Sequence, residues 1–144
     1  MEIKEEEIQE IIDASNEDAD FSDKYIRDDT CEKIATLLRA SNKKKRLSLR
    51  SNYIGADGLV AIAELIKSDM VIKELNLEWN QVGSMEHGIM VFSSALETNQ
   101  CLVSLNLCNN HISTQGAKNL ARALRTNQTL ESVDLRWNEV GTPG

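Results

Sequence analysis

The sequence predicts an α/β solenoid in which a parallel sheet lines the concave side and helices cover the convex side. Two observations lead to this prediction. Aliphatic residues and an asparagine return in one fixed order, and the asparagines Asn52, Asn80, Asn110 and Asn138 follow one another at intervals of 28, 30 and 28 residues. Self-similarity at such a period is the signature of stacked structural repeats, and each repeat is long enough for one strand and one helix.

The recurring order is L-x-x-L-x-L-x-x-N-x-L, with aliphatic residues in the leucine places. An earlier copy, with Leu47, Leu49, Asn52 and Ile54, has Lys44 in the first aliphatic place. This order defines a leucine-rich repeat, so the expected fold is a leucine-rich-repeat solenoid, or horseshoe. The defining residues of the three complete copies are Ile72, Leu75, Leu77, Asn80 and Val82; Leu102, Leu105, Leu107, Asn110 and Ile112; and Leu130, Val133, Leu135, Asn138 and Val140.

Each place in the pattern has a mechanical reason. Alternate side chains of a strand point to opposite faces, so Leu75 and Leu77 are expected in the core while Asn76 and Glu78 face outward. The repeated asparagine ends the strand. Its amide both donates and accepts hydrogen bonds, and can therefore satisfy buried backbone groups of the turn. Stacked asparagines are expected to form a ladder.

The segments between the strands have the aliphatic spacing of amphipathic helices. We expect the glycines at their start, Gly58, Gly88 and Gly116, to permit close approach, and Asn99 and Asn127 to end helices in the left-handed conformation. Two additional residues between Val82 and Gly88 are expected to lengthen a loop that contains residues 85–87. The helices are expected over residues 59–67, 89–98 and 117–126.

The chain divides into two parts. Residues 1–16 are expected to form an acidic N-terminal capping helix, because isoleucines lie along one stripe of an otherwise charged segment. Residues 17–144 are expected to be leucine-rich repeats: one degenerate, three regular and the last one truncated. In the degenerate copy Phe21 and Ile26 fall in phase, and a helix is expected over residues 30–40. The chain ends at Thr142-Pro143-Gly144, after a strand pattern, so the last repeat is expected to expose an edge.

Composition excludes several classes of function. Twelve acidic and three basic residues lie within residues 1–30, whereas the rest of the chain carries eleven acidic and thirteen basic residues. The near-neutral repeat body argues against a nucleic-acid binder, which needs a basic stripe. The basic run 43–46 is interpreted as a solvated loop rather than a phosphate site. No membrane span, metal-ligand spacing or paired cysteine framework is visible, which favours a reduced, cytoplasmic compartment.

Outward residues of the strands are the candidate binding surface. Trp79 and Trp137 occupy the same register position two repeats apart, beside Glu78 and Arg136. Tryptophan and arginine dominate binding hot spots, so a protein partner is expected to dock here, on the concave face. The alternative is that each tryptophan packs over the turn of a neighbouring repeat. The remaining candidates in the same grid are Asn76, Asn106, Asp134 and Arg50.

Catalysis is not expected. The sequence contains no glycine-rich phosphate loop, HExxH or GxSxG motif, and no cofactor or metal site is predicted. His111 is interpreted as a solvated turn residue. Cys108 is interpreted as a small outward-facing residue, because no histidine lies near it in register to activate a thiol.

The consensus LxLxxNxIGxxGxxxLAxxL resembles the ribonuclease-inhibitor class of leucine-rich repeats, which includes immune-sensor repeats, tropomodulins and the activating proteins of Ran GTPase. The strings at residues 77–80 and 135–138, together with the two-residue lengthening after the first, resemble the N-terminal repeats of the leucine-rich repeat-containing protein 45 family, from about residue 18 to residue 141. That family joins its repeats to a coiled coil in the fibrous linker between centrioles. The resemblance implies a scaffold at the centrosome or cytoskeleton, although this chain has no coiled-coil heptads.

Two other functions stay open. A regulator that resembles the Ran activators would use Asn76, Asn106 or Arg50 to orient groups of a GTPase. An immune-type module would use the repeats to sense a ligand, and would be joined to a nucleotide-binding domain in a longer gene product. The repeat pattern is shared too widely to decide between these functions.

Overall fold

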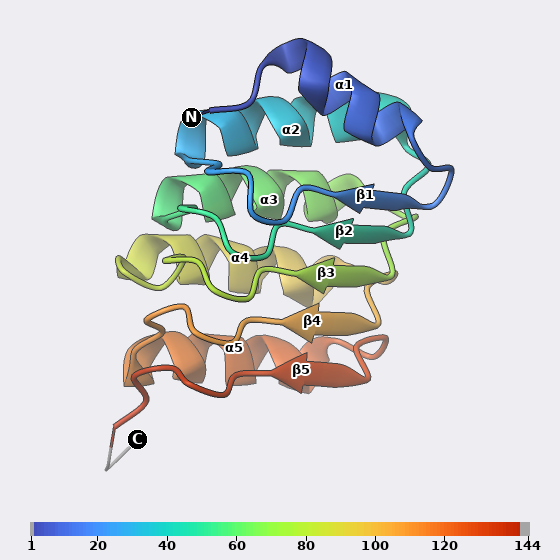
Figure 1. The fold of residues 1–144 in the computed structure, drawn as a ribbon. Coiled ribbons are helices and arrows are strands. Elements are labelled where there is room, and N and C mark those ends of the chain that lie inside the picture. The colour runs from blue at the N-terminus through green and yellow to red at the C-terminus, as the bar shows by residue number, and fades with distance from the viewer. Residues whose placement is uncertain (1, 142–144) are drawn as a thin grey trace.

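The fold is a stack of strand-helix units, as expected (Figure 1). The computed structural model of the chain describes residues 2–141. One parallel sheet has the strand order β1-β2-β3-β4-β5. The helices lie on one side of this sheet, and its opposite side is free of helices. The strands are β1 (Asp18–Asp20), β2 (Arg46–Ser48), β3 (Glu74–Asn76), β4 (Ser104–Asn106) and β5 (Ser132–Asp134). The sheet side is the concave side of a solenoid of this type, and is called the sheet face below.

The helices begin about three residues earlier than expected. They are α1 (Glu5–Asp13), α2 (Asp28–Ser41), α3 (Ala56–Ser68), α4 (Glu86–Thr98) and α5 (Thr114–Thr126). Gly58, Gly88 and Gly116 therefore lie within the first turn and do not start the helices. A Cβ atom on Gly88 would lie 2.8 Å from the Cα atom of Ala56. Contact between neighbouring repeats is what requires glycine there.

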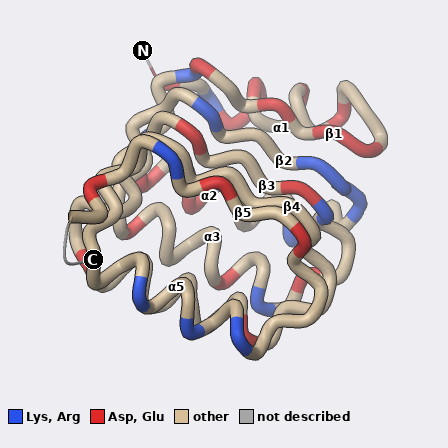
Figure 2. Tube along the Cα trace, turned by 90° about the horizontal axis from the view of Figure 1, so that it is seen from below, with Lys and Arg blue, Asp and Glu red and all other residues tan. Residues whose placement is uncertain are grey.

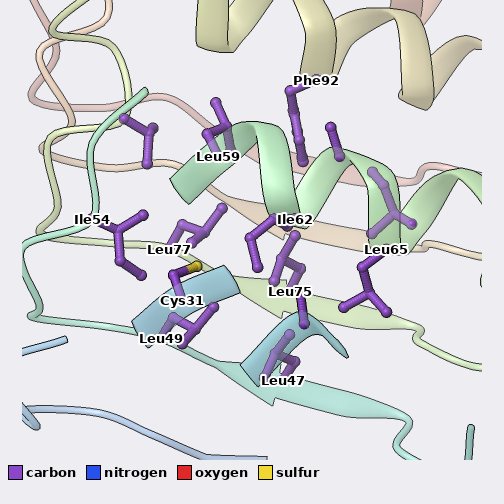
Figure 3. Packing of buried hydrophobic residues seen from close by; sticks show 14 of the residues in the cluster. Cys31, Leu47, Leu49, Ile54, Leu59, Ile62, Leu65, Leu75, Leu77 and Phe92 are labelled. Atoms are coloured by element: carbon purple, nitrogen blue, oxygen red, sulfur yellow. The ribbon is translucent and has the colours of Figure 1, made fainter. Parts of the chain in front are cut away.

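The leucines of the pattern form the core in strict register. Leu47 lies beside Leu75, which lies beside Leu105. These side chains are buried against the inner faces of the helices, where Ile62 is also buried, and Figure 3 shows this layer between the strands and α3. Burying a side chain of this size contributes roughly 1.5–3 kcal/mol, and in a stack of repeats each unit is covered by its neighbours.

The predicted asparagine ladder is present. Asn110 is fully buried. Its Nδ2 atom donates to the carbonyl oxygens of Leu77 (2.8 Å) and Cys108 (3.0 Å), and its Oδ1 atom accepts from the amide of Val82 (3.2 Å). The same exchange recurs at the other ladder positions, Asn52, Asn80 and Asn138. Each asparagine therefore joins its own turn to the preceding repeat.

The expectation for Asn99 and Asn127 was wrong. Both residues are extended, with φ of −67° and −68°. Their side chains form a second ladder at the opposite end of the strands: Asn99 Nδ2 donates to the carbonyl of Ile66, and Asn127 Nδ2 donates to that of Leu96, each at 2.8 Å. The left-handed C-cap belongs to α2 instead, at Asn42, with φ of 49°.

The lengthened loop lies earlier than expected. Met85 is the N-cap of α4, so Glu86 and His87 belong to the helix rather than to the loop. The two additional residues correspond to Gly83 and Ser84. The Gly83 amide donates to the carbonyl of Asn110 at 2.9 Å, which attaches this loop to the next repeat.

The basic run at residues 43–46 is only partly solvated, which corrects the expectation of a solvated loop. Lys44 is buried, and its ammonium group donates to the carbonyls of Ile12 and Ser15 at the end of α1. Arg46 forms an ion pair with Asp18. Basic side chains thus attach the acidic N-terminal segment to the first regular repeat. The expected chain end at residues 142–144 lies outside the described residues.

Candidate functional site

The parallel register arranges the outward residues of the sheet face in rows that run across the strands. Three rows contain the candidate residues. They lie one, three and four residues after the central residue of each strand, and are called the near row, the middle row and the turn row. The near row is Asp20, Ser48, Asn76, Asn106 and Asp134; the middle row is Ser22, Arg50, Glu78, Cys108 and Arg136; the turn row is Asp23, Ser51, Trp79, Asn109 and Trp137. All eight predicted site residues fall in these rows.

The near row has a structural role that the sequence did not indicate. Asn76 Oδ1 accepts from the amide of Glu78 at 2.9 Å, and Asn106 Oδ1 accepts from that of Cys108 at 3.0 Å. Asp134 does the same for Arg136. These are Asx turns, in which a short polar side chain shapes the backbone two residues on. The oxygen of each side chain is therefore occupied within its own repeat.

Three of the five residues in the middle row are charged. The Nε atom of Arg50 lies 3.3 Å from a carboxylate oxygen of Glu78 in the next repeat. Arg136 donates to Asp134 from Nε (2.9 Å) and from its terminal nitrogen (2.7 Å). These hydrogen bonds hold the pKa of Asp134 well below its ordinary value. The Arg136 side chain remains largely exposed and available to a partner.

Cys108 departs from its expected outward position, because it is buried. Burial, and then the neighbouring Asp134 carboxylate, raise the pKa of its thiol. A catalytic cysteine needs the opposite shift, since the thiolate is the nucleophile. His111 is exposed, and its ring contacts the carboxylate of Glu139 in the next repeat. The geometry therefore gives neither residue an activated catalytic role.

The turn row adopts the left-handed conformation in every repeat. The φ values are 58° at Asp23, 56° at Ser51, 59° at Trp79, 55° at Asn109 and 62° at Trp137. This conformation costs an L-residue roughly 1–2 kcal/mol, and Asn and Asp tolerate it best. The backbone conformation thus favours small polar residues in the turn row. It does not account for tryptophan at two of these positions.

The two tryptophans expose a large part of their surface. Trp79 keeps 54% of its surface accessible and Trp137 keeps 77%. They lie two strands apart, which corresponds to about 10 Å at the usual strand spacing, with Asn109 between them. We call Trp79, Trp137 and Arg136 the tryptophan patch.

Two exposed aromatics were missed by the sequence analysis. Tyr25 and Tyr53 follow the ladder position in neighbouring repeats, and their ring centroids lie 6.2 Å apart with planes 18° from parallel. Arg27 lies over the Tyr53 ring. The signal that could have revealed the pair was their separation of 28 residues, which equals one repeat. With Trp79, they line a hollow of about 500 Å³.

Other kinds of site find little support in the geometry. Within residues 2–141, no group of three or more His, Cys, Asp or Glu side chains is placed to hold a metal ion. None of the helices in the same range combines the length and apolar character that a membrane crossing requires. The three cysteines are unpaired and buried.

Comparisons with known proteins agree with this architecture. The family profile described as Leucine Rich repeat matches residues 45–63, 98–121 and 126–144. Leucine-rich repeat-containing protein 45 of Gallus gallus is 38% identical over 84 residues, which are 58% of this chain and 12% of that protein. NACHT, LRR and PYD domains-containing protein 5 of Mus musculus is 31% identical over 91 residues, which are 63% of this chain and 8% of that protein. The chain thus spans a small part of either relative.

Two solved structures share the fold. The actin-binding site 2 of leiomodin-1 superposes with a TM-score of 0.79 at 23% identity, covering 94% of this chain and 80% of that one. The tropomodulin C-terminal domain of Caenorhabditis elegans superposes with a TM-score of 0.74 at 15% identity, covering 89% and 79%. At these identities the similarity shows the fold alone. The repeats, their ladders and these similarities together show a leucine-rich-repeat fold, with sequence similarity to leucine-rich repeat-containing protein 45.

Proposed function

We propose that this chain is a cytoplasmic docking scaffold of the centrosome linker or cytoskeleton, and that it binds a protein partner through the tryptophan patch on its sheet face. The observation that carries the proposal is the exposure of Trp79 and Trp137 at backbone positions where the fold favours small polar residues. The centrosomal assignment rests on the similarity to leucine-rich repeat-containing protein 45.

The energetics favour a binding role for the patch. An exposed indole in left-handed backbone destabilises the free chain, and this cost is offset when a partner buries the ring. Burying an indole ring removes a large apolar area from water while few rotatable bonds become fixed. Tryptophan is therefore common among the residues that contribute most to binding. Arg136, held by Asp134 in a fork, adds a fixed cation beside Trp137.

The test is a pull-down of centrosome-linker proteins with the wild-type chain and with the double variant Trp79→Ala, Trp137→Ala. We expect the double variant to lose capture while its melting curve stays close to that of the wild type. The matched control is Ser51→Ala with Asn109→Ala, which changes the same register row without removing an aromatic ring. Equal capture by the wild type and the tryptophan variant would remove the proposal.

Actin is a second partner to test, because one similar structure is an actin-binding site of leiomodin-1. That similarity concerns the fold alone. It suggests actin as a partner to test, but it does not indicate which residues would bind actin. Co-sedimentation with actin filaments decides: binding that depends on the tryptophans assigns the patch to the actin cytoskeleton, and absence of binding leaves the centrosome linker as the proposed setting.

The GTPase-regulator alternative gains little from the geometry. Asn76 and Asn106 use their oxygens in Asx turns, and Arg50 is paired with Glu78. A residue that orients a nucleotide-bound partner would need these groups free. The ligand-sensing alternative is supported by the similarity to NACHT, LRR and PYD domains-containing protein 5, but the matched segment covers 8% of that protein. No feature of the sheet face favours this alternative.

A further inference from the structure

The tyrosine pair forms a ridge between two hollows of the surface. On one side, Tyr25, Tyr53 and Trp79 line the hollow of about 500 Å³, together with Asp23 and Arg50. On the other side, the same two tyrosines line a hollow of about 340 Å³. Volumes of this size lie within the range of roughly 300–1,000 Å³ that is usual for binding sites. The ridge and its two hollows are called the tyrosine groove.

The fold does not require aromatic rings here. The equivalent places in the following repeats hold the polar residues Gln81, His111 and Glu139. Tyr25 and Tyr53 keep 56% and 50% of their surface accessible, and Tyr25 has a left-handed φ of 57°. All tyrosines and tryptophans of the chain are exposed on these turns, whereas both phenylalanines are fully buried. The tyrosine and tryptophan rings therefore contribute an exposed aromatic surface instead of packing in the core.

Acidic side chains flank the ridge at the smaller hollow. Glu2 and Asp29 line it with Arg27, and Asp28 lies in a neighbouring hollow that also includes Tyr53. None of the three carboxylates takes part in an ion pair within the described range 2–141. Glu2 and Asp29 are held in place by hydrogen bonds with Thr30, each of 2.9 Å. The carboxylates of Glu2 and Asp29 outnumber the one guanidinium of this hollow, that of Arg27, so this end of the groove is net negative and favours a cation.

Three backbone amides of the groove are already engaged, which disfavours recognition by strand addition. The amide of Tyr53 donates to the carbonyl of Ile26 at 2.8 Å, and the amides of Lys24 and Ile26 donate to the ladder residue Asn52. The exposed side-chain faces are therefore the favoured surface for a ligand. Proline-rich segments bind such faces: they form a polyproline II helix without internal hydrogen bonds, and dock their rings on aromatic grooves at low entropic cost.

We propose that the tyrosine groove binds a proline-rich segment of a protein, in the polyproline II conformation, with a basic residue three positions before its first proline. Prolines three residues apart are separated by about 9 Å, which lets one ring lie between Tyr53 and Trp79 and the other beyond the ridge. The basic residue pairs with Glu2 and Asp29. This goes beyond the proposed function, with which it shares one residue, Trp79.

The test uses tryptophan fluorescence, because the chain has only two tryptophans. The variant Trp137→Phe leaves Trp79 as the single reporter, and it is titrated with a synthetic peptide of the form R-x-x-P-x-x-P. We expect a saturable change in emission. Replacing the peptide's prolines by alanine, or its arginine by glutamate, is expected to weaken binding tenfold or more, and so is Tyr53→Ala in the protein.

The controls separate this proposal from the tryptophan patch. His111→Ala changes the same register position outside the groove, and is expected to bind the peptide as the wild type does. Amide chemical-shift mapping on the unsubstituted chain gives a second measurement, with shifts expected at residues 23–29, 50–53 and 79. No saturable change at millimolar peptide, equal binding of the alanine peptide, or shifts elsewhere would overturn the proposal. A failed centrosomal pull-down would leave it intact.

Discussion

The buried ammonium group of Lys44 donates a hydrogen bond to the backbone carbonyl of Ile12, across 32 residues of sequence. In the regular repeats this place holds an aliphatic side chain. Here the lysine reaches under the N-terminal helix α1 and satisfies its last carbonyls, which a helix leaves without intrahelical partners. One basic side chain therefore attaches α1 to the first regular repeat.

Replacing Lys44 by alanine is expected to loosen α1. Hydrogen bonds from a charged donor contribute about 1.5–3 kcal/mol when buried, so Lys44→Ala should lower the free energy of unfolding by about that amount. Hydrogen exchange should also become faster in residues 5–13. The neighbouring Lys43→Ala is the control, since Lys43 is exposed. Equal stability of the two variants in urea denaturation would show that Lys44 does not hold α1 in place.

The ladder residue Asn110 is expected to be among the most sensitive positions of the chain. Its side chain makes three hydrogen bonds to backbone groups, and is fully buried. Asn110→Ala leaves those groups without partners, at a cost of about 1–3 kcal/mol for each unsatisfied group. We expect a loss of at least about 3 kcal/mol in urea denaturation. Asn119→Ala on α5, a partly exposed position, is expected to change stability by less than about 0.5 kcal/mol.

The strand register, the core and the asparagine ladder could be predicted because all three follow from the constant spacing of leucines and asparagine within each repeat. A period-2 alternation that keeps Leu75 and Leu77 in the core can pair with Leu105 and Leu107 in only one register. The asparagine follows at a constant distance, so its partners are the same in each turn. These features depend on local spacing, which the sequence contains.

Contacts between repeats could not be predicted in the same way. Whether Lys44 is buried depends on where the last turn of α1 ends, and Cys108 is buried although its register position faces outward elsewhere. The Tyr25–Tyr53 stack likewise requires the turns of two repeats to lie side by side. The left-handed turn row was also missed, because Asp, Ser, Asn and Trp share no property that marks the conformation.

Gly88 is expected to tolerate no side chain. Its Cβ atom would lie 2.8 Å from the Cα atom of Ala56 in the preceding helix, and backbone cannot move aside as a flexible side chain can. Gly88→Ala should therefore destabilise the chain by about 1–3 kcal/mol through overpacking, despite the better helix propensity of alanine. Gly141→Ala is the control, because nothing lies within 4 Å of that position. A melting temperature of Gly88→Ala at or above that of the control would contradict this.

Cys108 is expected to react slowly with alkylating reagents, and the rate should rise with pH. Burial and the Asp134 carboxylate raise the pKa of the thiol, so at pH 8–9 the folded chain holds less of the reactive thiolate than an unfolded chain does. Asp134→Asn removes the negative charge, lowers this pKa and should speed alkylation at fixed pH. Arg136→Gln removes a positive charge and should slow it. Mass spectrometry of the Cys108 peptide after iodoacetamide treatment measures both, and rate changes of the same sign in the two variants would contradict the electrostatic account.

Trp137 is expected to cost the free chain stability. Its ring is 77% exposed and its backbone is left-handed, a conformation that asparagine adopts more readily, as Asn109 does in the preceding repeat. Trp137→Asn should therefore raise the free energy of unfolding by about 0.5–1 kcal/mol, because part of the roughly 1–2 kcal/mol backbone cost is relieved. The reverse substitution Asn109→Trp should lower it by a similar amount. A loss of stability in Trp137→Asn would mean that the indole packs for structural reasons. Higher stability combined with weaker capture of a partner is the outcome that a binding role requires, since selection would then have kept the ring for the complex rather than for the fold.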